Sequence, residues 1–423
     1  MKKYILHVLY VSFFAIIIFG FQYLPLQDYP VLIYQGFVFN QAVFHGFDFG
    51  GFFHFHPYIP PNAISTVILG IMDIFADPFV TGKIYLFLLA IALYSGIIRY
   101  LRLHLTMNRM AFASIAFFLT INVHLLMCYL NFLTGLAIVF HAIVFIRRRN
   151  YESHYLALAL VILLIYLCHF ATLALFFLYF FFYFLTKKNY RGLIRFGVSA
   201  IPALGIFIHY LLTRTLPILP LKEEYARFID IIHWKFLILF SPLIPFNDFK
   251  WVYDVPYALR IADYIFSVVV LLLIMYVVGK NIFNRTFSLE VWLAVSTFLL
   301  AVFLPLNFGG VIPAGERVVV FCMVHITIIF YRENLSQTFR KAAFALCFLL
   351  GIAAYSYDLW NTAHFDSMIG RNEIPQDAIT RSYEKLEGTN GFLHLHFYDD
   401  IKQKKPYPFF NIGLFEYPGS DKE

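Results

Sequence analysis

Apolar residues run along this chain in stretches far longer than the stripe of a water-exposed helix or the alternation of a strand. A helix needs about 20 mostly apolar residues to cross the hydrocarbon core of a bilayer. The stretches that approach this length are residues 4–23, 84–103, 110–127, 133–146, 155–168, 173–186, 194–212, 264–278, 289–304, 318–331 and 342–355. The pattern predicts an all-α, polytopic membrane protein with about eleven transmembrane helices.

Two of these boundaries come from splitting longer apolar runs. Residues 110–146 and 155–186 are each too long for one span, and basic residues flank each run on both sides. Each run must therefore cross the membrane and return, with turns near residues 128–131 and 169–172. Because the second run is short for two spans, a re-entrant hairpin stays open as an alternative.

The composition agrees with the pattern, since 61% of the residues are hydrophobic, 20% are aromatic and only 13% are charged. A soluble domain carries about 25% charged residues. These values exclude a disordered chain, a small secreted domain held together by disulfides and an ordinary cytosolic enzyme.

The placement of the basic residues predicts the orientation. No Lys or Arg occurs between Leu24 and Lys83, whereas Arg and Lys cluster at the alternate ends of the predicted spans. Cytoplasmic loops carry the excess of basic residues. We therefore expect a multi-pass cell-membrane protein with a cytoplasmic N-terminus, in which the net charge of +7 reflects orientation and no nucleic acid is bound.

On this topology residues 1–355 form the transmembrane domain, with outer loops at about 24–83 and 213–263. Within the first loop, residues 62–79 are apolar but carry Asp73 and Asp77, which favours a helix lying at the outer interface. Residues 356–423 form a small extracytoplasmic α/β domain, in which the alternation at 391–398 is typical of a strand.

Asp28 is the first charge after the first predicted span and falls at the outer interface. A carboxylate there can stay ionised and act as a general base toward a lipid-borne substrate. The alternative is that Asp28 caps the following helix or marks the end of the span.

The same loop contains Asp48 and the sequence His54-Phe55-His56, which puts both imidazoles on one face of an extended segment. Together with a carboxylate they could hold a divalent metal (Mg or Mn), bind a phosphate or shuttle a proton. The alternative is an interfacial aromatic run in which histidines are polar tips. The sequence assigns no cofactor with certainty.

Near the other end of the chain, Glu316 and Arg317 follow a Gly-rich outer turn and precede an apolar run. A guanidinium at this depth needs an anion, and a lipid phosphate is a suitable one. An ion pair with Glu316 or with another outer carboxylate is the alternative.

The layout resembles the GT-C class of membrane glycosyltransferases, in which an acid follows the first helix and an interfacial helix lies in a long first outer loop. Asp28, Tyr29 and Pro30 are similar to a "DYP" signature of uncharacterised bacterial members, and the match ends there. The resemblance implies a cell-envelope enzyme that takes a sugar from a polyprenyl-phosphate donor, with Asp28 as base. The acceptor would be a glycan, a lipid or a protein.

Two other functions stay open. A transporter or flippase for a lipid-linked solute would need ionisable residues or broken helices near the middle of the bilayer. A scaffold that kept the fold without activity would fit the departures at Val31, Leu32 and Gln35, where the signature has Asn, His and Arg.

Overall fold

The computed structural model describes residues 5–22, 29–47, 54–106, 109–121, 128–149, 154–213, 278–284, 287–304, 315–332 and 415–416, together with isolated residues at 24, 26, 49 and 125 and between 261–276 and 338–367. Nearly all of this part of the chain is helical, which confirms the predicted all-α class. The main elements are α1 (Ile5–Phe19), α2 (Tyr29–Phe44), β1 (His54–Phe55), α3 (Ile64–Met72), α4 (Pro78–His104), α5 (Arg109–Thr120), α7 (Leu130–Arg149), α8 (Tyr155–Cys168), α9 (Phe170–Thr186), α10 (Tyr190–Thr213), α14 (Leu289–Phe303), the 3₁₀ turn η3 (Glu316–Val318), α15 (Val319–Arg332) and β2 (Phe415–Glu416).

Most of the apolar stretches are helices at nearly the expected boundaries. Three helices, α4, α7 and α10, are long and apolar enough to cross a membrane, and seven shorter helices among the described residues are also apolar. The predicted spans at 264–278 and 342–355 are described only at scattered positions, so the count of about eleven stays a prediction.

The first predicted outer loop contains more structure than we expected. Residues 29–44 form the helix α2, which we did not predict from the sequence pattern. The single helix predicted over residues 62–79 is wrong in its extent, because α3 ends at Met72 and α4 begins at Pro78. Its location at the outer interface stays a prediction. Asp77 caps α4 by accepting a hydrogen bond from the backbone N–H of Phe79 at 2.9 Å, and Pro78 occupies the first turn, where it lacks only an N–H that has no helical partner.

Helices α2 and α3 cross at two glycines. A Cβ on Gly36 would lie 2.5 Å from the Cβ of Leu69, and a Cβ on Gly70 would lie 2.9 Å from the carbonyl oxygen of Gly36. Hydrogen atoms in place of side chains let the two backbones approach, as small residues do at membrane helix contacts. The side chain of Asn40 then donates a hydrogen bond to the carbonyl of Gly70 at 2.9 Å, which fixes the pair.

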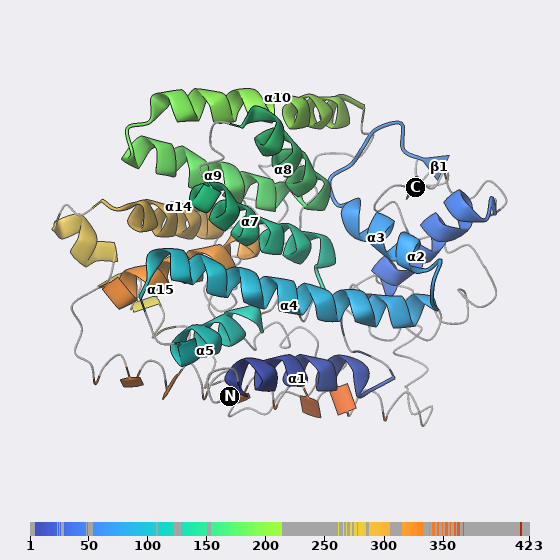
Figure 1. The fold of residues 1–423 in the computed structure, drawn as a ribbon, viewed down its shortest axis with the longest axis horizontal. Coiled ribbons are helices and arrows are strands. Elements are labelled where there is room, and N and C mark those ends of the chain that lie inside the picture. Colours follow the sequence, from blue (N-terminus) through green and yellow to red (C-terminus); the bar gives the residue numbers. More distant parts are fainter. Residues whose placement is uncertain are drawn as a thin grey trace.

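The remaining helices form a bundle around α4 and α7, which lie side by side along the long direction of Figure 1, with α2, α3 and β1 at one end. β1 pairs with β2 in antiparallel register, so that His54 lies opposite Glu416. Helix α10 lies at an edge of the bundle and exposes apolar side chains along its length. These include Ile194, Val198, Ile201, Leu204, Ile208 and Leu211. An apolar face of this size suits lipid better than water.

Candidate functional site

The structure describes some of the predicted site residues and not others. Asp28 and Asp48 lie outside the described residues, so their roles stay predictions. For His54 and Glu316 the structure describes the backbone alone, in β1 and in η3. Tyr29, His56 and Arg317 are described with their side chains.

Tyr29 begins α2 and is buried against the start of α4. Its hydroxyl donates a hydrogen bond to the carbonyl of Phe79 at 3.3 Å, and a Cβ on Gly82 would lie 2.9 Å from that hydroxyl oxygen. Burial raises the pKa of Tyr29 well above its ordinary value, and the nearby Cys128 and Asp77 act in the same direction. Tyr29 is therefore a neutral hydrogen-bonding group close to the segment that precedes α7.

Arg317 lies against the same segment. Only 8% of its surface is exposed, and its guanidinium carbon lies 4.0 Å from the centre of the Tyr129 ring and 5.7 Å from that of Phe132. An aromatic face attracts a cation and restrains the planar guanidinium. Residues 128 and 129 thus connect the surroundings of Tyr29 with the cation that the sequence predicts to bind phosphate.

A buried carboxyl group lies in the bend between α3 and α4. Asp73 accepts a hydrogen bond from the hydroxyl of Thr81 through one carboxylate oxygen, whereas the other oxygen is buried with no hydrogen-bond partner. Burial raises the pKa of Asp73 to about 7, although the hydrogen bond from Thr81 lowers it, and the charge of Asp77 raises it further. This carboxyl can therefore hold or release a proton near neutral pH.

His56 belongs to an aromatic group. Its ring is stacked on Tyr58, with 4.6 Å between the ring centres, and Tyr58 in turn contacts Tyr210 of α10 edge to face at 5.3 Å. This environment favours the alternative in which the histidine is part of an aromatic surface. In the part of the chain that the structure describes, no three His, Cys, Asp or Glu side chains are grouped so that they could hold a metal ion.

The predicted helix turns contain two polar side chains with structural partners. His169 caps α9, because its Nδ1 accepts a hydrogen bond from the N–H of Ala171 at 3.0 Å. The side-chain oxygen of Asn131 accepts one from the N–H of Ser65 at 2.9 Å. Both groups therefore stabilise the fold.

At the opposite end of the bundle, a buried ionic group joins helices that are far apart in sequence. Nδ1 of His104 in α4 donates to the carboxylate of Glu290 in α14 at 2.8 Å, and the guanidinium of Arg332 in α15 lies 2.8 Å from the other carboxylate oxygen. Arg147 of α7 is 3.4 Å from Nε2 of His104 and donates to the hydroxyl of Tyr179 at 3.1 Å. These contacts tie five helices together.

Sequence reasoning did not identify this ionic group. The available signal was Glu290, the single acidic residue in the apolar run at 289–304, because a lone ionisable residue in such a run is buried only with a partner. Its partners could not be inferred, since they lie in α4 and α15. His104, Glu290 and Arg332 each lie in the first or last turn of their helices.

Comparison with known protein families, curated proteins and solved structures finds no match for this chain.

Proposed function

We propose that the chain is a multi-pass membrane glycosyltransferase that uses a polyprenyl-phosphate sugar at the outer face of the cell membrane. In this proposal about eleven helices span the bilayer, the N-terminus is cytoplasmic, and residues 356–423 form a domain on the outer side. The apolar face of α10 and the apolar length of α4 and α7 support membrane insertion.

The observation that carries the proposal is the position of Arg317. A buried guanidinium held against Tyr129 is preorganised for an anion, and it lies beside the segment that also approaches Tyr29. Tyr29 directly follows Asp28, the predicted base. The cation proposed to bind phosphate thus lies beside the segment that approaches Tyr29, the residue that follows the proposed base in the sequence.

The proposed reaction is an inverting displacement at the anomeric carbon of the sugar. Asp28 takes the proton of the acceptor hydroxyl as its oxygen forms the new bond, and the bond from the anomeric carbon to the phosphate oxygen breaks. The electron pair remains on the polyprenyl phosphate, whose added negative charge Arg317 stabilises. Asp48, His54 and Glu316 are the further positions proposed to contact substrate, whereas the buried Tyr29 and the stacked His56 are proposed to support the structure around them.

The test uses the purified full chain in lipid nanodiscs and a panel of radiolabelled polyprenyl-phosphate sugars, with extracted envelope glycans, lipids and proteins as acceptors. We expect transfer from at least one donor, a loss of about 10²-fold or more in kcat for Asp28→Asn, and a similar loss for Arg317→Gln. Arg317→Lys keeps the charge without the planar group and should retain part of the rate.

Two variants serve as matched controls. Asp77→Asn removes a carboxylate from the same end of the bundle while keeping a good helix cap, and Lys187→Gln removes a cation from the opposite end. Both should keep the wild-type rate. Full activity of Asp28→Asn, or no transfer by the wild-type protein from any donor in the panel, would contradict the proposal.

A further inference from the structure

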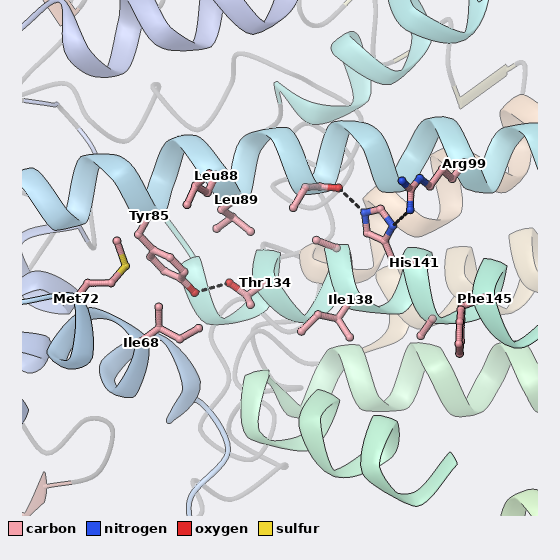
Figure 2. Close-up of a pocket in the computed structure, with 13 residues that line it drawn as sticks. Ile68, Met72, Tyr85, Leu88, Leu89, Arg99, Thr134, Ile138, His141 and Phe145 are labelled. Atoms are coloured by element: carbon pink, nitrogen blue, oxygen red, sulfur yellow. Dashed lines mark hydrogen bonds between the residues drawn. The ribbon is translucent and has the colours of Figure 1, made fainter. Parts of the chain in front are cut away.

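A groove runs along the contact between α4 and α7, on the surface of the bundle. It has a volume of about 610 Å³, and Ile68 and Met72 of α3 close one end (Figure 2). Alanines at positions 92 and 137 form part of its floor and leave the space that larger side chains would fill. Leu88 and Phe145 border it and are 54% and 50% exposed, so the groove is open to the surroundings of the helices.

The end of the groove near α3 contains a satisfied polar group. The hydroxyl of Tyr85 is 2.7 Å from the hydroxyl of Thr134 and 3.0 Å from that of Ser65. These hydroxyls form hydrogen bonds with one another, so a ligand needs no polar group at this end of the groove. The middle of the groove is apolar.

The other end carries a cation. Arg99 lies at this end opposite His141, as Figure 2 shows, and its guanidinium is 3.5 Å from Nδ1 of that imidazole. Nε2 of His141 lies 3.0 Å from the carbonyl of Ala92, to which it donates. Nδ1 is then the acceptor for Arg99, and the imidazole is neutral. Among the described residues no carboxylate pairs with Arg99, whose positive charge is exposed at the mouth of the groove.

The dimensions suit a lipid chain. Tyr85 and Arg99 are separated by about 21 Å along α4, at a rise of about 1.5 Å per residue. This is roughly two-thirds of the hydrocarbon thickness of a bilayer, which is about 30 Å. Helix α7 ends in Arg148 and Arg149, three and four residues beyond Phe145, and these arginines add positive charge at this end of the helix.

We infer that this groove binds one acyl chain of an anionic glycerophospholipid of the cytoplasmic leaflet, with its phosphate on the guanidinium of Arg99. Charge complementarity selects the anionic head, and the apolar floor accepts the chain. This site is separate from the one that contains Arg317. The inference rests on the topology proposed above and not on sugar transfer, so it can fail or succeed independently of the enzymatic activity.

The test is photo-labelling of the purified full chain in phosphatidylcholine nanodiscs. A small fraction of the lipid is a photoreactive probe that carries a diazirine on its acyl chain. The probe is phosphatidylglycerol in one experiment and phosphatidylcholine in the other. We expect mass spectrometry to locate the label on the groove residues Leu88, Ile138 and Phe145, with the phosphatidylglycerol probe favoured about fivefold, the scale of one basic residue at a membrane surface. Equal labelling by the two probes, or label spread evenly over other apolar faces such as that of α10, would overturn the inference.

Three variants separate head-group binding from chain binding. Arg99→Gln should abolish the preference for phosphatidylglycerol, whereas Arg102→Gln, which removes an exposed arginine three residues later on the side of α4 that faces Phe112, should keep it. Ala92→Phe should fill the groove and reduce labelling by both probes. If Arg102→Gln loses the preference as fully as Arg99→Gln, the effect is one of general surface charge and the inference is wrong. Gel filtration and thermal unfolding confirm that each variant is folded. The comparison of the two probes on the wild-type protein tests the inference even if a variant fails to fold.

Discussion

Glu290 of α14 and His104 of α4 form a hydrogen-bonded pair at 2.8 Å in which both side chains are almost completely buried. Arg332 provides a second contact to the same carboxylate, but its own side chain is 44% exposed. The carboxylate is therefore the centre of the group, and its removal leaves two basic side chains without their common acid.

We expect Glu290→Ala to lower the free energy of unfolding by about 2–3 kcal/mol, somewhat below the usual cost of breaking a buried pair because water can reach Arg332. Thermal unfolding of the purified protein in detergent measures the change. Arg191→Ala, an exposed arginine in α10, is the control and should unfold at the wild-type temperature. Wild-type stability of Glu290→Ala would show that the contact contributes nothing.

The free energy of unfolding should depend on pH because burial raises the pKa of Asp73. Its pKa is about 7 in the folded protein against 3.8 for an unperturbed aspartic acid, so the folded state binds this proton more tightly than the unfolded state. Stability therefore falls as the pH rises from about 4 to about 7. Asp73→Asn removes the titrating group and should become relatively more stable than the wild-type protein above pH 7.

Thermal unfolding of the wild-type protein and Asp73→Asn at a series of pH values measures this difference. An infrared band of a protonated carboxyl that disappears near neutral pH, and is missing in the variant, would identify the group directly. Parallel pH profiles for the two proteins would contradict the assignment.

The crossing of α2 and α3 should not tolerate a side chain at Gly36. A methyl group there would lie 2.5 Å from the Cβ of Leu69, which cannot move without its helix. We expect Gly36→Ala to cost about 1–3 kcal/mol of unfolding free energy. Gly205→Ala in α10, where nothing lies within 4 Å of the added atom, is the matched control and should be neutral or slightly stabilising. The same loss in both variants would mean that helix contact is not the cause.

The topology can be tested by cysteine labelling in cells, in a background in which the native cysteines are replaced by alanine. Phe75, in the bend between α3 and α4, is 82% exposed, and Lys187 is exposed at the end of α9. We expect a membrane-impermeant maleimide to label Phe75→Cys in intact cells and Lys187→Cys only after permeabilisation. The reverse pattern would invert the proposed orientation.

Local features explain which parts of the fold the sequence could predict. The run at 155–168 forms α8 with those boundaries, because its residues are consecutively apolar or aromatic and the polar His154 and His169 stand at its two ends. The boundary between α3 and α4 was harder to predict from the sequence, because the apolar pattern continues through Asp73 and Asp77. The break depends on Asp77 acting as a cap for a second helix that begins at Pro78, a helix-start signal that the apolar pattern obscured.

The sequence by itself determined that the described part of the protein is all-α and where most of its helices lie, because apolar length and helix propensity are properties of consecutive residues. It also singled out Arg317, since a lone cation at the start of an apolar run requires a partner. Only the tertiary structure decided that Tyr129 lies beneath that cation, that Glu290 pairs with His104 across 186 positions of the chain, and that α4 and α7 leave a groove ending at Arg99. Such contacts depend on how helices cross, and many packings of apolar faces are compatible with one hydrophobic pattern.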